Sequence, residues 1–167
     1  RIKNEMVPGT EGGFTKLYPE EKVVPIYDAV VEYKKRGTDL VVIGGKEYGT
    51  GSSRDWAAKG TKLLGIKAVI AESFERIHRS NLIGMGILPL QFKDNLNRKN
   101  LKFVGSELIS VIDIEKGIDP SDIVKLEIKY HSGEIKTIKT LCRIDTKNEL
   151  EYYKNGVILQ YVLGNMI

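Results

Sequence analysis

The segment GGKEYGTGSSRDW, residues 44–56, gathers residue types that bind small anions. Ser52 and Ser53 carry hydroxyl groups, and Arg54 carries a guanidinium whose paired N–H donors match the two oxygens of a carboxylate. The glycines allow close backbone approach to a ligand, and the free N–H groups of a helix starting here attract negative charge. A serine in this place can also act as a base where Arg54 and backbone N–H groups stabilise its alkoxide.

A helix cap without any further function explains part of the same pattern. Ser52 and Asp55 have the spacing of a capping box. Capping does not call for Arg54 in the first turn, where the helix dipole disfavours a cation, so the residues leave both an anion pocket and a simple cap open. Nucleotide loops are excluded because the third glycine of the dinucleotide fingerprint is missing and Lys46 precedes the glycines.

The histidines and the cysteine lie outside this segment. Because His78 and His131 are elsewhere in the sequence, no Ser-His-Asp triad is indicated. We expect a structural or solvent-facing role for His78 and a turn position for His131. Cys142 is the single cysteine, which excludes an internal disulfide, and its apolar surroundings predict a buried thiol. The basic runs at 34–36 and 76–79 are expected to be solvated helix faces.

The elements that must position residues 44–56 follow from the spacing of apolar residues. A continuous apolar run at 40–43 is typical of a strand covered on both faces. The segment leaves that strand at its carboxyl end, where open α/β sheets bind ligands. A helix is expected to follow from near Ser53 and to end at Gly65. Its inner face is expected to carry Trp56, Ala57, Gly60 and Leu64.

The rest of the first half alternates between helices and strands. Helical spacing begins at Val23 and ends at Gly37. Residues 66–71 predict a second strand and 87–90 a third, where Pro89 favours a sheet edge or a bulge. This order predicts a partly parallel sheet with crossover helices. The helix between the last two strands is expected to turn Phe74, Ile77, Asn81 and Leu82 inward.

After Phe92 the pattern predicts antiparallel strands at 108–114, 123–130 and 135–143, the last two joined by a turn at 131–134. Helical spacing returns over 148–166, with an interruption at Asn155 and Gly156. The chain therefore predicts one α/β domain over residues 1–167. Its parts are a lead-in loop (1–22), a βα core (23–92) and a part with antiparallel strands and C-terminal helices (93–167).

Composition is that of a globular chain and excludes several classes. The 167 residues are 41% hydrophobic and 29% charged, and no apolar run reaches the roughly 20 residues of a membrane span. A net charge of +4 suits anionic ligands, but the basic residues are scattered. No targeting pattern is present, and the chain begins at Arg1. We expect it to be cut from a longer protein, which leaves a cytoplasmic or mitochondrial-matrix location open.

Residues 45–60, GKEYGTGSSRDWAAKG, resemble the swivel-domain signature of the aconitate hydratase family, which includes the iron-regulatory proteins. The resemblance continues through 64–82 and 84–90, and the lead-in is similar at 1–4 and 11–15. It weakens between about 93 and 140. It thus spans most of the chain and is very specific over the core.

The resemblance implies a swivelling β/β/α domain of an enzyme that interconverts citrate and isocitrate through cis-aconitate. It implies that Ser52 is the catalytic base, which abstracts a proton from carbon, and that Ser53 and Arg54 hold substrate carboxylates. It also implies a [4Fe-4S] cluster, held by three cysteines of other domains, that acts as a Lewis acid at the substrate hydroxyl. The swivel domain closes over that cluster.

Two departures limit what this chain does by itself. Cys142 alone cannot supply three cluster ligands, and another substrate-binding arginine of the family lies upstream of Arg1. We therefore expect the isolated chain to bind no metal and to be inactive. Its expected partners are the remaining domains of the enzyme and citrate or isocitrate, with no membrane.

Three alternatives stay open beside this interpretation. The small subunit of isopropylmalate isomerase is a free-standing domain with a related Gly-Ser-Ser-Arg loop, although the continuation DWAAKG at 55–60 favours the aconitase side. Dehydratases for homologous tricarboxylates share similar loops. Iron-regulatory proteins grip an RNA hairpin, which makes RNA an alternative partner, and Arg54 suits a phosphate as well as a carboxylate.

Overall fold

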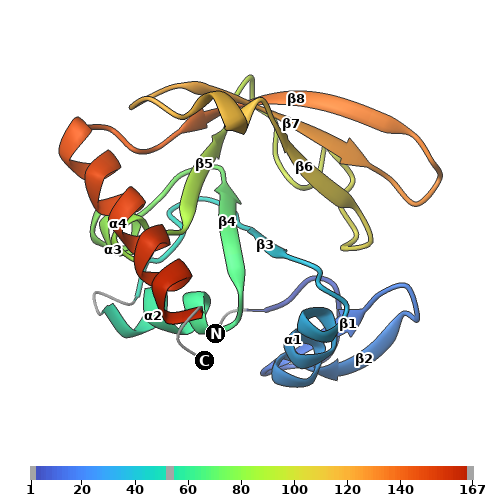
Figure 1. The fold of residues 1–167 in the computed structure, drawn as a ribbon. Helices are drawn as coiled ribbons and strands as arrows, with labels where there is room; N and C mark the ends of the chain where they lie inside the picture. The colour runs from blue at the N-terminus through green and yellow to red at the C-terminus, as the bar shows by residue number, and fades with distance from the viewer. Residues whose placement is uncertain (1–2, 52–54, 165–167) are drawn as a thin grey trace.

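The computed structural model describes residues 3–51 and 55–164, in which helices pack against a mixed six-stranded sheet (Figure 1). The strand order is β3-β4-β5-β8-β7-β6; β3, β4 and β5 run parallel, and every later pairing is antiparallel. This arrangement confirms the predicted α/β class with its partly parallel first half. The elements are β1 (Phe14–Leu17), β2 (Lys22–Pro25), α1 (Ile26–Lys35), β3 (Leu40–Ile43), α2 (Asp55–Leu63), β4 (Ile66–Ala71), α3 (Arg76–Gly84), β5 (Leu88–Phe92), β6 (Leu108–Ile112), η1 (Ile114–Lys116), β7 (Ile123–Lys129), β8 (Ile135–Cys142) and α4 (Lys147–Gly164).

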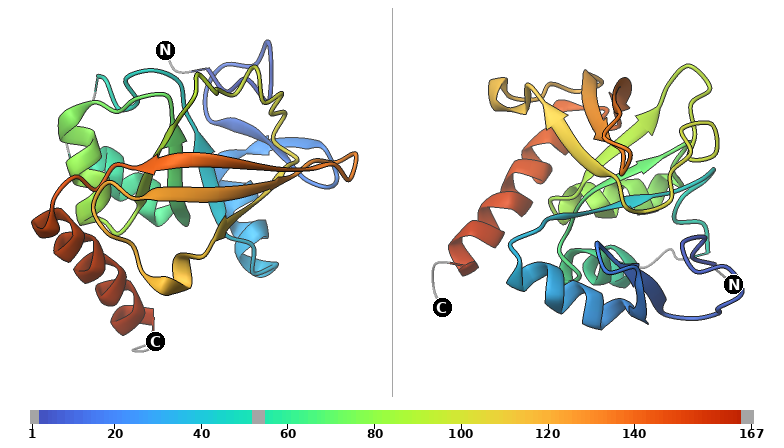
Figure 2. Two further views of the ribbon diagram at one scale, coloured as in Figure 1. Left: turned by 90° about the horizontal axis from the view of Figure 1, so that it is seen from above. Right: turned by 90° about the vertical axis from the view of Figure 1, so that its right-hand side faces the viewer.

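The first part of the chain contains a hairpin that the spacing did not predict. β1 pairs antiparallel with β2, and α1 begins at Ile26 rather than at Val23, which lies in β2. Pro25 explains the difference, because a proline in a helix interior removes a hydrogen bond and disfavours the helical conformation of the residue before it. The hairpin and α1 lie together, away from α3 and α4 (Figures 1 and 2).

β3 and β5 differ from their predicted environments. β3 is one of the two edge strands of the six-stranded sheet, and Val41 is 36% exposed, so the prediction of a strand covered on both faces is wrong for β3. β5 lies between β4 and β8 with Pro89 fully buried, so neither an edge nor a bulge accommodates this proline. Pro89 still accepts a hydrogen bond from the Arg143 N–H through its carbonyl at 2.9 Å, and the Arg143 carbonyl, which lies opposite the missing N–H, accepts from Arg79 instead.

The apolar core has two clusters, separated by β4. Because successive side chains of a strand point to opposite faces, Ile70 joins one cluster and Val69 the other. The first cluster joins residues of β5, β7 and β8 with Ile83 of α3 and Leu150 of α4, and it includes Cys142, which confirms the predicted buried thiol. The second includes Ala58 of α2 and Leu82 of α3. Both faces of β4 are therefore covered, and its carboxyl end is fixed.

The predicted inner face of α2 is wrong at Trp56. Trp56 is 71% exposed and the Lys59 ammonium lies 4.7 Å from its ring centroid, whereas Ala58 is fully buried. The basic run at 34–36 is exposed, as predicted. His131 lies in the turn between β7 and β8, also as predicted.

The predicted inner face of α3 is also wrong in part. Ile77 is 46% exposed, whereas His78 and Arg79 are buried. Arg79 donates to the Arg143 carbonyl at 2.6 Å, and the same nitrogen lies 2.8 Å from a Glu149 carboxylate oxygen. These partners come from the end of β8 and from α4, so Arg79 is not part of the solvated face that its charge suggests.

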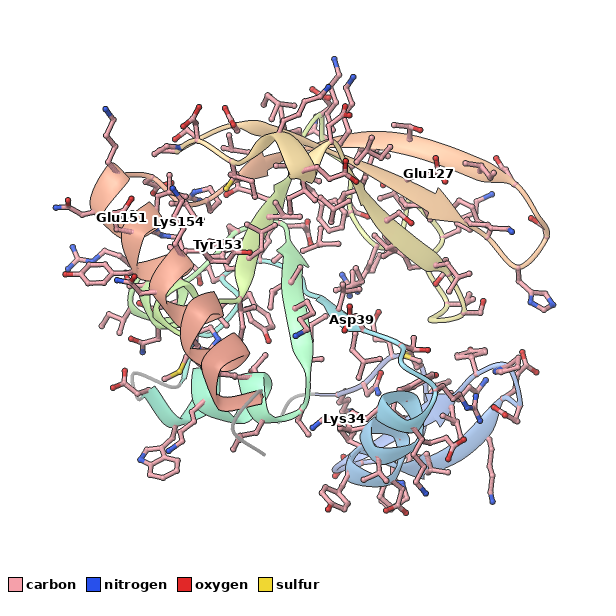
Figure 3. All side chains as sticks on the ribbon, in the orientation of Figure 1. Lys34, Asp39, Glu127, Glu151, Tyr153 and Lys154 are labelled. Atoms are coloured by element: carbon pink, nitrogen blue, oxygen red, sulfur yellow. The ribbon has the colours of Figure 1, made fainter. Side chains whose placement is uncertain are left out.

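α4 continues through Asn155 and Gly156, so the predicted interruption is wrong. Gly156 is buried, and a Cβ there would lie 2.6 Å from the Gly86 backbone nitrogen. A residue without a side chain therefore lets α4 approach the end of α3. Tyr153 lies on the side of α4 that faces β5 (Figure 3) and packs against the first core cluster. Within the described ranges, none of the helices has the length and apolar character needed to span a bilayer.

Candidate functional site

The segment predicted to bind an anion lies at the carboxyl end of β3, beside the carboxyl end of β4. Residues 44–51 leave β3, and α2 begins at Asp55. Ser52, Ser53 and Arg54 come between them and lie outside the residues that the structure describes. The structure shows the frame on either side of these three residues.

Hydrogen bonds fasten residues 44–50 to the segment that follows β4. The Tyr48 N–H donates to the Ser73 carbonyl at 2.9 Å, and the Tyr48 carbonyl accepts from the Glu75 N–H at 2.9 Å. The Glu47 N–H donates to the Ser73 hydroxyl oxygen at 2.7 Å. Two more backbone hydrogen bonds nearer the strands continue the contact. The loop after β3 is therefore held by the loop that leads into α3.

A tight turn at residues 47–50 sets the direction in which the chain leaves this contact. The Thr50 N–H and the Thr50 hydroxyl both donate to the Glu47 carbonyl, at 3.1 and 2.7 Å. Glu47 has φ 51° and Gly49 has φ 97°, both in the left-handed region. Glycine adopts such a conformation without steric cost.

Tyr48 anchors the loop in the core. Its ring makes edge contacts with the rings of Phe74 and His78, at centroid distances of 6.1 and 5.4 Å. Burial raises the pKa of the Tyr48 hydroxyl, while a hydrogen bond with Thr61 of α2 acts in the opposite direction. Tyr48 therefore stays a neutral phenol and touches both helices that flank the candidate site.

His78 lies directly beneath the loop, which sequence reasoning did not predict. It is only 3% exposed, and a Cβ on Gly49 would lie 2.3 Å from its Cγ atom. Burial lowers the pKa of His78, although the Glu75 carboxylate acts in the opposite direction. Its Nδ1 atom is buried and has no hydrogen-bond partner in the described part of the chain. Of the two roles expected for His78, the solvent-facing one is wrong because the side chain is buried, and its place at the loop was not predicted.

Glu75 caps the amino end of α3. One carboxylate oxygen accepts from the Ile77 N–H at 3.0 Å and the other from the His78 N–H at 2.8 Å. These hydrogen bonds lower the pKa of Glu75, the one from His78 most strongly. Such a cap satisfies N–H groups that have no partner within the helix.

A second arginine, Arg98, lies at the edge of the same loop. Its Nε and Nη2 atoms donate to the two Glu5 carboxylate oxygens at 2.7 and 2.6 Å, and its Nη1 lies 3.9 Å from a Glu72 oxygen. Nη1 is also 3.8 Å from the position of a Cβ on Gly45. Because two carboxylates surround the guanidinium, Arg98 ties the first loop of the chain to the site. The sequence pattern offered no signal for it within the polar connection 94–102.

Metal-binding side chains do not form a cluster among the described residues of this frame. No group of three or more His, Cys, Asp or Glu side chains could hold a metal ion there. Two hollows in the described surface lie elsewhere, one beside η1 and one between α1 and the start of β4.

Comparison with known proteins gives a consistent set of relatives. Residues 1–95 match the family described as "Aconitase C-terminal domain". The chain is 64% identical over 163 residues to aconitate hydratase A of Legionella pneumophila, a match that covers 98% of this chain and 18% of that protein. It is 56% identical over 167 residues to aconitate hydratase A of Escherichia coli K12, covering 100% of this chain and 19% of that protein. The chain thus spans about a fifth of the length of these relatives.

One solved structure is also similar. The crystal structure of 3-isopropylmalate dehydratase from Methanocaldococcus jannaschii aligns with a TM-score of 0.48 and 26% identity, covering 86% of both chains.

Proposed function

The chain belongs to the aconitase C-terminal domain family, and from this we propose that it is the substrate-closing domain of an aconitate hydratase, which interconverts citrate and isocitrate through cis-aconitate. The observation that carries the proposal is 64% and 56% identity to two aconitate hydratases A over 98% and 100% of the chain. Because the chain spans about a fifth of those proteins, activity belongs to the longer enzyme. The rest of that enzyme and its tricarboxylate substrate are then the partners of this domain.

In this proposal Ser52 is the base, and Ser53 and Arg54 hold substrate carboxylates. In the dehydration direction Ser52 takes a proton from one carbon of the substrate, and hydroxide leaves the neighbouring carbon. The electrons of the broken C–H bond then form the double bond between these two carbons. The alkoxide form of Ser52 needs nearby positive charge and N–H donors. Arg54 supplies a permanent charge in a fork that matches a carboxylate, and the start of α2 supplies free N–H groups.

This chain does not fit the iron–sulfur cluster of such an enzyme. Several cysteine thiolates hold a cluster of this kind, whereas the sequence contains Cys142 alone. Burial raises the pKa of Cys142, which keeps it a neutral thiol inside the core. We therefore assign the cluster to other domains of the enzyme, and no step proposed for this chain passes through it.

The test uses the longer enzyme that carries this domain, assayed for formation of cis-aconitate from citrate. Ser52→Ala should lower kcat by roughly 10²- to 10⁴-fold, with KM within about three-fold, because a base contributes to the transition state and little to binding. Arg54→Lys should raise KM roughly tenfold because the paired donors are lost. A normal kcat for Ser52→Ala would remove Ser52 from the chemistry.

The matched control is Ser80→Ala. The Ser80 hydroxyl lies on the exposed side of α3 and donates to the Arg76 carbonyl at 3.2 Å, so its loss should leave kcat and KM unchanged. Turnover of isopropylmalate in place of citrate would favour the isopropylmalate isomerases. Salt-dependent binding of a bulged RNA hairpin, in preference to a scrambled one, would favour an RNA role. No contact among the described residues favours either over the hydratase.

A further inference from the structure

Two segments that are far apart in the sequence are held together beside the candidate site. The first is the entry segment, residues 3–10, and the second is the connecting segment, residues 93–107, between β5 and β6. Arg98 of the connecting segment donates to both Glu5 carboxylate oxygens, at 2.7 and 2.6 Å. Such a paired, charge-assisted contact is directional as well as strong, and its hydrogen bonds lower the pKa of Glu5.

Further contacts fasten the start of the chain to the connecting segment. A Cβ on Gly105 would lie 2.8 Å from the Met6 sulfur, so the Met6 side chain packs directly on the backbone there. The next residue, Val7, is 3% exposed. Farther along the chain, the Tyr18 hydroxyl donates to the Val104 carbonyl at 3.3 Å. The entry segment is therefore a packed part of this domain rather than a free tether.

The connecting segment is in turn anchored in the core. Leu101 is 2% exposed and belongs to the first core cluster, and its carbonyl accepts from the Tyr130 hydroxyl of the residue that follows β7 at 2.7 Å. The Phe103 ring stacks on the Tyr130 ring at a centroid distance of 6.5 Å. The Phe103 N–H donates to the Arg98 carbonyl at 3.0 Å. The backbone from which Arg98 extends is thus fixed to the antiparallel half of the sheet.

Arg98 also reaches the edge of the sheet where the candidate site lies. Its Nη1 atom is 3.9 Å from a carboxylate oxygen of Glu72, which directly follows β4. The Glu72 N–H donates to the carbonyl of Gly45, which lies just after β3, at 3.1 Å. A Cβ on Gly45 would be 3.8 Å from the same Nη1 atom. Arg98 therefore joins the entry segment to the carboxyl ends of both strands.

We propose that Arg98 is a positioning residue for the longer enzyme: by holding Glu5, it keeps the polypeptide that enters this domain at the carboxyl ends of β3 and β4, and so sets where the rest of the enzyme meets the candidate site. The inference rests on the proposed function, in which this domain closes on substrate together with the rest of the enzyme. The chain covers 18% and 19% of two aconitate hydratases, and its family is described as C-terminal, so the rest of that polypeptide precedes the entry segment.

This role has a kinetic signature that differs from a loss of stability. If the entry segment comes loose, only a fraction of the molecules presents the edge correctly, and the apparent dissociation constant of the substrate rises by the inverse of that fraction. Saturating substrate selects the correct arrangement, so kcat is retained. A loss of stability instead removes active enzyme, which lowers kcat at an unchanged KM.

The kinetic test replaces Arg98 in the longer enzyme, assayed for dehydration of citrate. The Glu5 side chain is 62% exposed, and exposed ion pairs contribute at most about 1 kcal/mol, which corresponds to roughly a five-fold change. Arg98→Met should therefore raise KM about five-fold with kcat within about two-fold. Arg98→Lys keeps the charge without the paired donors and should raise KM only about two-fold. An unchanged KM, or a lower kcat at an unchanged KM, in Arg98→Met would overturn the positioning role.

Salt provides a second kinetic readout. Because salt screens exposed ion pairs, the difference in KM between the wild type and Arg98→Met should become smaller as the salt concentration rises. Comparison of the two enzymes cancels the effect of salt on substrate binding itself. A difference that stays constant up to 0.5 M salt (about a 4 Å screening length) would show that the ion pair does not carry the effect.

The matched control compares Glu5→Gln with Glu20→Gln. Glu20 lies in the turn between β1 and β2, and its two carboxylate oxygens accept from Arg36 at 3.2 and 2.6 Å. Its side chain is 46% exposed, so the same substitution removes the same kind of ion pair at both positions. Glu5→Gln should raise KM about as much as Arg98→Met, and Glu20→Gln should leave it unchanged. An equal rise in both glutamine variants would overturn the proposal.

A measurement on the 167-residue chain is independent of enzyme activity. The Val7 N–H donates to the Asn4 carbonyl at 3.2 Å within the entry segment, and its hydrogen exchange reports how firmly that segment is held. Arg98→Met and Glu5→Gln should accelerate this exchange about five-fold, and Glu20→Gln should not. Unchanged exchange in Arg98→Met would refute the inference. If exchange accelerates as expected but the longer enzyme does not dehydrate citrate, the proposed function fails and the attachment of the entry segment stands.

Discussion

Gly156 of α4 and Gly60 of α2 should respond in opposite directions to the same substitution, glycine to alanine. In the interior of a helix this change normally stabilises a protein by about 0.5–1 kcal/mol. At Gly60 no heavy atom lies within 4 Å of the added Cβ, so only this gain applies. At Gly156 the Cβ would lie 2.6 Å from the Gly86 nitrogen and 2.9 Å from the Gly84 carbonyl oxygen, which are backbone atoms without rotamers.

The magnitude at Gly156 follows from these distances. Carbon contacts are comfortable at about 3.5–4.0 Å, so α4 must retreat by roughly 1 Å from the end of α3. Overpacking of this kind costs about 1–3 kcal/mol; the middle of that range, about 2 kcal/mol, less the propensity gain of about 0.5–1 kcal/mol, leaves a net loss of about 1–1.5 kcal/mol. For a chain of this size each kcal/mol moves the melting temperature by about 2–4 °C.

The assay is thermal and urea unfolding of the full chain, followed by circular dichroism. Gly60→Ala should raise the melting temperature by a few degrees and Gly156→Ala should lower it, with unchanged m-values in urea. If Gly156→Ala stabilises the chain as much as Gly60→Ala does, the close approach of α4 to α3 is not a feature of the protein in solution.

Two further predictions concern the charges that hold α3. Arg79→Met should lower the free energy of unfolding by about 2–3 kcal/mol, which is below the range for fully buried ion pairs because the Glu149 side chain is 18% exposed. In urea unfolding, the double variant Arg79→Met with Glu149→Gln should lose at least about 1 kcal/mol less stability than the two single variants lose together. Because the pKa of Glu75 is lowered in the fold, its contribution is present above its ordinary pKa and is lost as the pH falls through the lowered value. Glu75→Gln should therefore reduce the loss of stability between pH 7 and pH 3, and an unchanged acid slope would contradict the capping role.

The strands of the first half could be predicted because their signals are local. The run at 40–43 and the residues of β4 form strands at the predicted positions. The hairpin turn at 131–134 was predictable for the same reason, since glycine and serine mark it directly. Such patterns depend on backbone preference and on burial of whole segments, and both are properties of neighbouring residues.

The errors arise where a distant partner decides the environment of a side chain. Ile77 is the more apolar residue, yet Arg79 is buried because Glu149 and the Arg143 carbonyl neutralise and solvate its guanidinium. Gly156 does not end α4 because it meets the backbone of α3. In these cases the sequence shows the residue but not its partner, and periodicity alone favours the wrong face or a break.

The candidate site combines both situations. That a glycine-rich segment follows a strand and precedes a helix is local information, and it was enough to predict that the segment leaves the carboxyl end of β3; ligand binding there stays a prediction. What supports the loop is not local: His78 contacts Gly49, and Arg98 reaches Glu5 and Glu72, from segments that carry no motif for the task. His78 of α3 was excluded as a triad member because it lies outside the loop in the sequence. In space it contacts the loop, but as a packed, neutral ring.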